Sequence, residues 1–114
     1  MGRLKVDVAT YTGVAVAHSF IAPDHCTIQK ITAHFSATPT TNEDFTVTQD
    51  MAAGAAYDVV LYEQDPVAIG LVNDLVASFT APYGELMRGD GLAIAYTNTD
   101  VATIGLSIFY EVHP

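Results

Sequence analysis

Apolar and polar residues alternate with a period of two along most of the chain. The pattern is strongest in residues 84–112, where Leu92, Ile94 and Tyr96 alternate with small or polar residues and the alternation resumes after the polar tip at 98–100. This period is typical of β-strands that bury one face and leave the other to smaller or more polar groups. We therefore predict two long strands in this stretch, paired as a hairpin.

The same alternation recurs in shorter runs separated by turn residues. In the first run Leu4, Val6 and Val8 share one face, and in the third Gln29 shares a face with Ile31, Ala33 and Phe35. No run has the length and the 3.6-residue period of an amphipathic helix, and the alanine-rich run MAAGAA, with its central glycine, is interpreted as a loop. The further expected strands are 3–10, 14–20, 26–37, 45–50, 57–65 and 74–80.

These patterns predict an all-β protein with about eight strands. Many short strands with turn signals between them indicate a sandwich or a barrel, and eight strands suit a jelly roll. We predict one domain over residues 1–114, an antiparallel, jelly-roll-like β-sandwich. An immunoglobulin-like sandwich is the neighbouring alternative, but the chain has no Trp and only one Cys, so the usual core of that fold is missing.

Composition adds a hint of assembly. Half of the 114 residues are apolar and only 15% are charged, where about a quarter is typical of soluble domains. A small protein with so few charges and a positive mean hydropathy is expected to hide more surface than a monomer does. The composition therefore favours self-association or docking onto something larger.

The charge balance narrows the range of partners. Thirteen acidic residues against four basic ones give a formal charge of −9, which repels a phosphate backbone, so no nucleic-acid partner is expected. No apolar run approaches the eighteen or so residues of a membrane helix, and Asp7 interrupts the only stretch that resembles a signal peptide. We expect a soluble, unprocessed protein with no membrane partner.

Candidate metal ligands are few and scattered. The histidines His18, His25, His34 and His113 do not show the spacing HExxH, and the single cysteine, Cys26, is expected to be a buried thiol. The spacing therefore predicts no metal site and no cofactor, although residues distant in the sequence can still converge in the fold. His34 and His113 are expected to be exposed or locally hydrogen-bonded.

The evidence for catalytic groups in the sequence is equally weak. We predict that the protein is not an enzyme and has no catalytic residues. The serines lie outside any nucleophile-elbow motif, and Glu63 and Glu111, the pair that could face each other as two acids, are interpreted as rim charges. Six aspartates fall at predicted strand ends or turns, where carboxylates either bind calcium or accept the hydrogen bonds that are usual in turns. Arg88-Gly89-Asp90 is interpreted as a turn rather than an adhesive motif. The tyrosines near turns, which could serve an interface, are Tyr57, Tyr62 and Tyr83.

Four segments together carry a family resemblance. They are ITAHFSATPTTNEDFTVT, AAYDVVLYEQDP, LMRGDGLAIAYTNTD and IGLSIFYEV, and they cover about residues 28–112. This combination of a Pro-Thr-Thr loop, a Tyr-Asp strand, a Gly-Asp turn and an Asn-Thr-Asp tip resembles small structural proteins of tailed bacteriophages and prophages. The shared motifs are structural rather than catalytic.

The resemblance implies a virion component, specifically a capsid decoration or cement protein. Such a protein is made in the host cytoplasm, docks on the major capsid protein at the capsid surface and associates with copies of itself, with a homotrimer as the expected state. The alternative is a carbohydrate- or receptor-binding β-sandwich module of a head or tail fibre, although the missing Trp removes the side chain best suited to stack on sugars.

Overall fold

The computed structural model describes residues 2–79 and 84–113 and is all-β, as predicted. Apart from one 3-10 turn at Ala55–Tyr57, its regular elements are strands, and no helix among the described residues is long and apolar enough to cross a membrane. The strands are β1 (Arg3–Thr12), β2 (Val16–Ile21), β3 (Cys26–Phe35), β4 (Phe45–Asp50), β5 (Val59–Gln64), β6 (Asp74–Ser78), β7 (Glu85–Leu86), β8 (Gly91–Tyr96) and β9 (Thr103–Val112).

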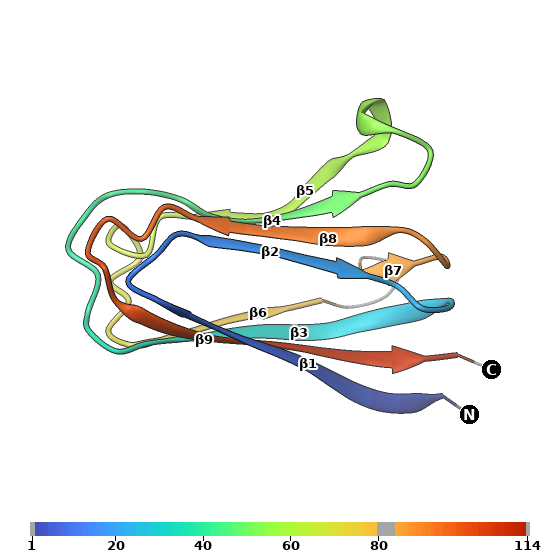
Figure 1. Cartoon of the computed structure of the whole chain (residues 1–114), viewed down its shortest axis with the longest axis horizontal. Coiled ribbons are helices and arrows are strands. Elements are labelled where there is room, and N and C mark those ends of the chain that lie inside the picture. The colour runs from blue at the N-terminus through green and yellow to red at the C-terminus, as the bar shows by residue number, and fades with distance from the viewer. Residues whose placement is uncertain (1, 80–83, 114) are drawn as a thin grey trace.

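The strands form two stacked antiparallel sheets (Figure 1). One sheet has the order β1-β9-β3-β6, with the short β7 also paired to β3, and the other has the order β2-β8-β4-β5. Only β4 and β5 are neighbours both in sequence and in their sheet, whereas most other connections cross from one sheet to the other. This order is the double Greek key of a jelly roll, which confirms the predicted fold class.

The predicted hairpin in residues 84–112 is wrong in its pairing. β8 lies between β2 and β4, whereas β9 lies between β1 and β3 in the opposite sheet. The polar tip therefore forms an arch between the two layers rather than a hairpin turn. Each strand carries a full set of inward apolar residues, so each is central in its own sheet, with a neighbour on both sides.

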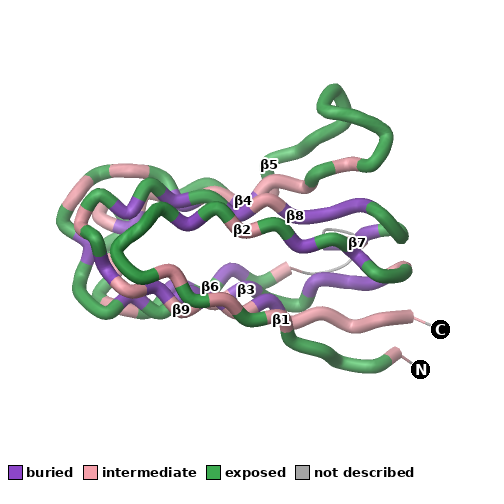
Figure 2. The backbone as a smooth tube through the Cα atoms, viewed as in Figure 1, coloured by how far each residue is buried: buried purple, intermediate pink, exposed green. Residues whose placement is uncertain are grey.

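The core fills the space between the two inner faces. Strand alternation directs every second side chain of the central strands inward, and in Figure 2 the buried residues recur along the strands of both layers. Phe35 of β3 packs across the interface against Tyr96 of β8, with ring centroids 5.5 Å apart, and Phe45 of β4 lies 5.9 Å from Tyr96. The largest fully buried side chains also include Ile28, Ile31, Leu75, Leu86, Leu92, Ile94, Ile104, Leu106 and Ile108.

Two strands depart from the simple alternation. A β-bulge between Ile28 and Lys30 shifts the register of β3 against β9, so Gln29 is exposed instead of sharing the buried face of Ile31 as predicted. In β1 the strand and its alternation are present, but the apolar set Leu4, Val6 and Val8 is directed away from the core.

The motifs that carry the resemblance contact one another at one end of the sandwich. Asp100, in the arch between β8 and β9, accepts hydrogen bonds from the backbone amide and hydroxyl of Thr40 and from those of Thr41. In return Glu43 accepts two hydrogen bonds from Thr99. The Pro-Thr-Thr loop and the Asn-Thr-Asp arch are thus joined by one network of hydrogen bonds, which we call the polar closure. Both motifs therefore have a structural role.

Candidate docking face

The outer face of the β1-β9-β3-β6 sheet is built from rows of residues that lie opposite one another on adjacent strands. Residues paired in this way in antiparallel strands share a face. The two central rows, read across β1, β9, β3 and β6, are Val8, Ser107, Thr32 and Val76, then Val6, Phe109, Lys30 and Ser78.

These rows expose an unusual amount of apolar surface. Val6 is 51% exposed, Val8 67% and Val76 58%, and Leu4 in the next row is 69% exposed. Leu4, Val6 and Val8 line β1 beside the half-buried Phe109 of β9, and Val76 lies on β6 beyond Ser107 and Thr32; together we call them the apolar face. Small residues such as Ser107 and Thr32 between them leave the sheet surface open to close approach. Contiguous exposed apolar surface of this kind marks interaction sites.

The two central rows of this face contain no carboxylate, although the protein has thirteen acidic residues. The one charged residue in the two central rows is Lys30, whose ammonium lies 4.7 Å from the centre of the Phe109 ring. This cation–π contact holds the lysine down on the sheet. The nearest carboxylates, those of Glu111, Asp74 and Glu85, stand in the flanking rows. A protein with thirteen acidic residues thus presents a neutral to slightly positive apolar centre.

A second exposed apolar feature is the arm formed by residues 51–60, which joins β4 to β5 and includes the first two residues of β5. It extends away from the sandwich on the side opposite the apolar face (Figure 1). Tyr57 in its 3-10 turn is 62% exposed, and Val59 and Val60 are 52% and 53% exposed. The arm is therefore accessible even where the apolar face is covered.

Three of the four histidines form hydrogen-bonded pairs with carboxylates. His18 of β2 contacts Asp7 of β1 at 2.8 Å through Nε2 and Tyr11 at 3.0 Å through Nδ1, which links the two sheets at their open side. The other two pairs, His34–Asp74 and His25–Glu85, flank the apolar face at its two ends. His34 is exposed and locally hydrogen-bonded, as predicted.

The residues weighed for catalysis are not brought together. Glu63 is on β5 and Glu111 is on β9, in opposite sheets, so the two carboxylates do not face each other across a cleft. A shallow depression of about 270 Å³ beside Val16 and Tyr96 is lined by small apolar and threonine side chains, with Asp44 at its rim. No nucleophile lies beside a base in that depression.

Arg88-Gly89-Asp90 is a turn, as predicted. Gly89 has a φ of +90°, and Asp90 is only 6% exposed because its carboxylate accepts hydrogen bonds from the amides of Ala52 and Met87. A carboxylate held inward in this way is not presented to a receptor. Asp58 and Asp65 likewise accept hydrogen bonds from nearby backbone amides, which is ordinary turn chemistry.

The remaining residues singled out from the sequence have distinct positions. Cys26 is fully buried, as predicted, and burial, together with the nearby carboxylates of Glu85 and Asp24, raises the pKa of its thiol to about 11. Tyr62 packs edge-on against Phe45, whereas Tyr57 is exposed on the arm. Tyr83 lies outside the described residues.

Sequence reasoning missed two features of this surface. The exposure of Val6 and Val8 in β1 could not be predicted, because alternation shows that a strand has two different faces but not which face meets the core. The grouping of His25, Glu85 and His113 at one end of the sheet, with ligand atoms within 4.8 Å of one another, was hidden because these residues follow one another at intervals of 60 and 28 residues in the sequence. No local spacing signals either feature.

Comparison with known proteins gives no further identification. No protein-family model matches the chain, and no curated protein matches it.

Proposed function

We propose that this protein is a structural component of a tailed-bacteriophage virion, a capsid decoration protein that self-associates and docks on the major capsid protein. The observation that carries the proposal is the apolar face, because a monomer gains nothing from exposing Leu4, Val6 and Val8 on one side of a sheet. The family-like loop motifs and the rigid jelly roll support the same role.

The occupant assigned to the apolar face is a second copy of the chain. Two molecules of charge −9 repel each other, and the repulsion is weakest where they meet through surfaces without carboxylates. The central rows of the apolar face meet this condition, and their one charge, on Lys30, is positive. Association through this face buries the exposed valines. The expected closed form, a trimer, is what the family resemblance implies rather than a consequence of this face alone.

We assign the contact with the major capsid protein to the arm at residues 51–60. It belongs to the opposite sheet, so it stays accessible in the trimer, and Tyr57 supplies the kind of aromatic contact that is enriched at interfaces. Several arms on one trimer would engage the shell together, so that weak individual contacts add to a stable attachment.

A sugar-binding role has less support. Tyr57 is the only aromatic among the large hydrophobic side chains that are exposed in the described part of the chain, so no stacking platform of several rings is present there.

The mass of the protein in solution tests self-association. Sedimentation equilibrium is expected to give a trimer for the natural chain and a monomer for Val6→Lys, which places a charge in the centre of the apolar face. Val60→Lys is the matched control, since it makes the same change at a valine of equal exposure on the other sheet and is expected to remain trimeric.

Binding to shells tests the capsid role. Particles of the source phage that lack this protein are expected to retain the added natural chain on sedimentation and to resist heating better. Tyr57→Ala is expected to weaken retention without changing the mass of the free protein. A chain that stays monomeric at all concentrations and does not sediment with such particles would contradict the proposal.

A further inference from the structure

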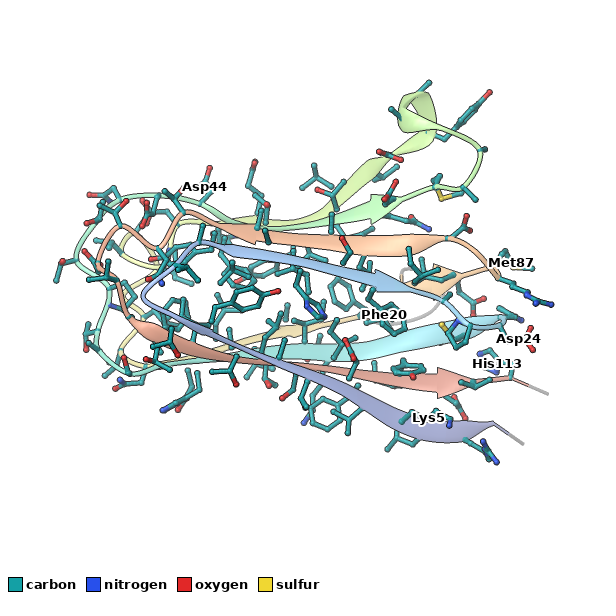
Figure 3. All side chains as sticks on the ribbon, viewed as in Figure 1. Lys5, Phe20, Asp24, Asp44, Met87 and His113 are labelled. Carbon is teal, nitrogen blue, oxygen red and sulfur yellow. The ribbon has the colours of Figure 1, made fainter. Side chains whose placement is uncertain are left out.

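We propose that His25, Glu85 and His113 form a binding site for a divalent transition-metal ion, with zinc as the preferred metal. The site lies at the end of the sandwich that carries both termini, where Figure 3 labels His113 close to Asp24. One ligand atom from each of the three side chains lies within 4.8 Å of the others, and all three side chains are partly exposed.

The sheet fixes the three residues side by side. His25 immediately precedes β3 and His113 immediately follows β9, and the amide of His113 donates a 3.0 Å hydrogen bond to the carbonyl of His25. Glu85 begins β7, which pairs with β3 on its other side, opposite Thr27. Three backbone segments that are distant in sequence therefore present their side chains on one face at neighbouring positions.

The three side chains also contact one another through hydrogen bonds and ring packing. Nε2 of His25 lies 2.8 Å from a carboxylate oxygen of Glu85, and the two imidazole rings are 4.6 Å apart. The hydroxyl of Thr27 donates to Glu85 at 3.2 Å and lies 2.6 Å from Nε2 of His113. These contacts hold the three side chains next to one another.

The donor set selects the class of metal. Two imidazole nitrogens and one carboxylate oxygen suit zinc and related transition metals, whereas calcium and magnesium prefer oxygen alone. Tetrahedral zinc with bonds of about 2.1 Å sets its ligands roughly 3.4 Å apart, so atoms as far apart as 4.8 Å must approach by about 1.4 Å. The side chains of His25 and Glu85 are 40% and 39% exposed, which leaves them free to rotate by that amount.

The rest of the site follows from this arrangement. Three protein ligands leave a fourth position for water or for a group from another molecule. Thr27 is 8% exposed and contacts two of the ligands, so it is a positioning residue that holds them in place. A zinc site here is independent of the role proposed above, because it requires neither self-association nor a capsid.

Zinc titration of the full chain after removal of metals with EDTA tests the site. Calorimetry is expected to give one zinc ion per chain and thermal melting a higher Tm, reversed by EDTA. His113→Ala and Glu85→Gln are each expected to weaken zinc binding at least tenfold, and Thr27→Val to weaken it less. His34→Ala is the matched control, since it removes a histidine paired with a carboxylate on the same sheet face but without a third ligand.

Cobalt provides a readout that does not depend on stability. Bound Co²⁺ is expected to give visible absorption bands that disappear in His113→Ala, even if that variant also melts at a lower temperature without metal. Zinc binding that is absent, that is unchanged in both His113→Ala and Glu85→Gln, or that is matched by magnesium at equal concentration would overturn the proposal.

Discussion

The side-chain amide of Asn98 donates a 2.9 Å hydrogen bond to the backbone carbonyl of Val14, 84 residues earlier in the chain. The same amide donates to the carbonyl of Ala102 at 2.9 Å, and the amide of Ala102 donates back to the side-chain oxygen of Asn98 at 3.0 Å. Asn98 is 3% exposed and has a φ of +58°. One buried side chain thus joins the arch between β8 and β9 to the loop between β1 and β2.

Asn98→Ala is expected to lower the free energy of unfolding by about 3 kcal/mol. The change leaves two carbonyls and one amide without their partner in a buried site and puts alanine in a left-handed conformation. Urea denaturation measures the loss. Asn42→Ala removes an exposed asparagine with one hydrogen bond to Asp65 and is expected to cost less than about 0.5 kcal/mol. Equal losses in the two variants would contradict the assigned role of Asn98.

Replacing Val101, in the same arch, is expected to make the protein more stable. Its φ is +51°, a conformation that is costly for a β-branched residue, and its side chain is 68% exposed, so it contributes little packing. Val101→Asn is expected to raise the free energy of unfolding by about 1 kcal/mol, measured by urea denaturation. Val14→Asn makes the same change at an exposed valine outside the left-handed region and should bring no such gain.

Phe35 connects the two layers, and its truncation is expected to be severe. Its ring lies 5.5 Å from that of Tyr96 and 6.5 Å from that of Phe45, both in the opposite sheet. Phe35→Ala opens a cavity between the layers and is expected to cost about 3–5 kcal/mol in thermal or urea unfolding. Tyr57→Ala, which truncates an aromatic residue on the exposed arm, should change stability by no more than about 0.5 kcal/mol.

The contrast between Phe35 and Leu4 shows what sequence patterns can and cannot provide. Alternation located most of the strands, and it identified Phe35, Leu92 and Ile94 as members of apolar faces because burial of one face imposes a period of two. The same alternation at Leu4, Val6 and Val8 is directed outward, because a pattern of two faces does not state which one meets the other sheet.

Local sequence patterns could not predict the strand pairing or the histidine cluster, because both depend on which distant strands become neighbours in the fold. β8 and β9 are adjacent in sequence, and adjacent strands usually pair, yet the jelly roll places them in opposite sheets. Gln29 does not share the buried face of Ile31, because the extra residue at the β-bulge reverses the alternation of faces along β3. His25, Glu85 and His113 meet only because β3 pairs with both β7 and β9, a consequence of topology rather than of spacing.

Asp100 is expected to make the stability of the protein depend on pH in the acid range. Its carboxylate accepts hydrogen bonds from the backbone amides and hydroxyls of Thr40 and Thr41, which lower its pKa from 3.8 to about 2. Because the folded state holds the proton less tightly than the unfolded state, this contribution to stability is fully present above about pH 4. It is lost as the pH falls towards about 2, where Asp100 is protonated in the folded state as well.

Comparison of the natural chain with Asp100→Asn isolates this contribution. The difference in urea midpoint between the two is expected to be constant from neutral pH down to about pH 5 and to shrink between about pH 4 and 2. Asp44→Asn, which changes an exposed carboxylate at the same end of the sandwich (Figure 3) and leaves the Thr40 and Thr41 hydrogen bonds intact, serves as the control. A difference between the natural chain and Asp100→Asn that stays unchanged down to pH 2 would show that the Thr40 and Thr41 hydrogen bonds do not stabilise the charged form. The closure between the Pro-Thr-Thr loop and the Asn-Thr-Asp arch would then have to depend on Glu43 and Thr99 instead.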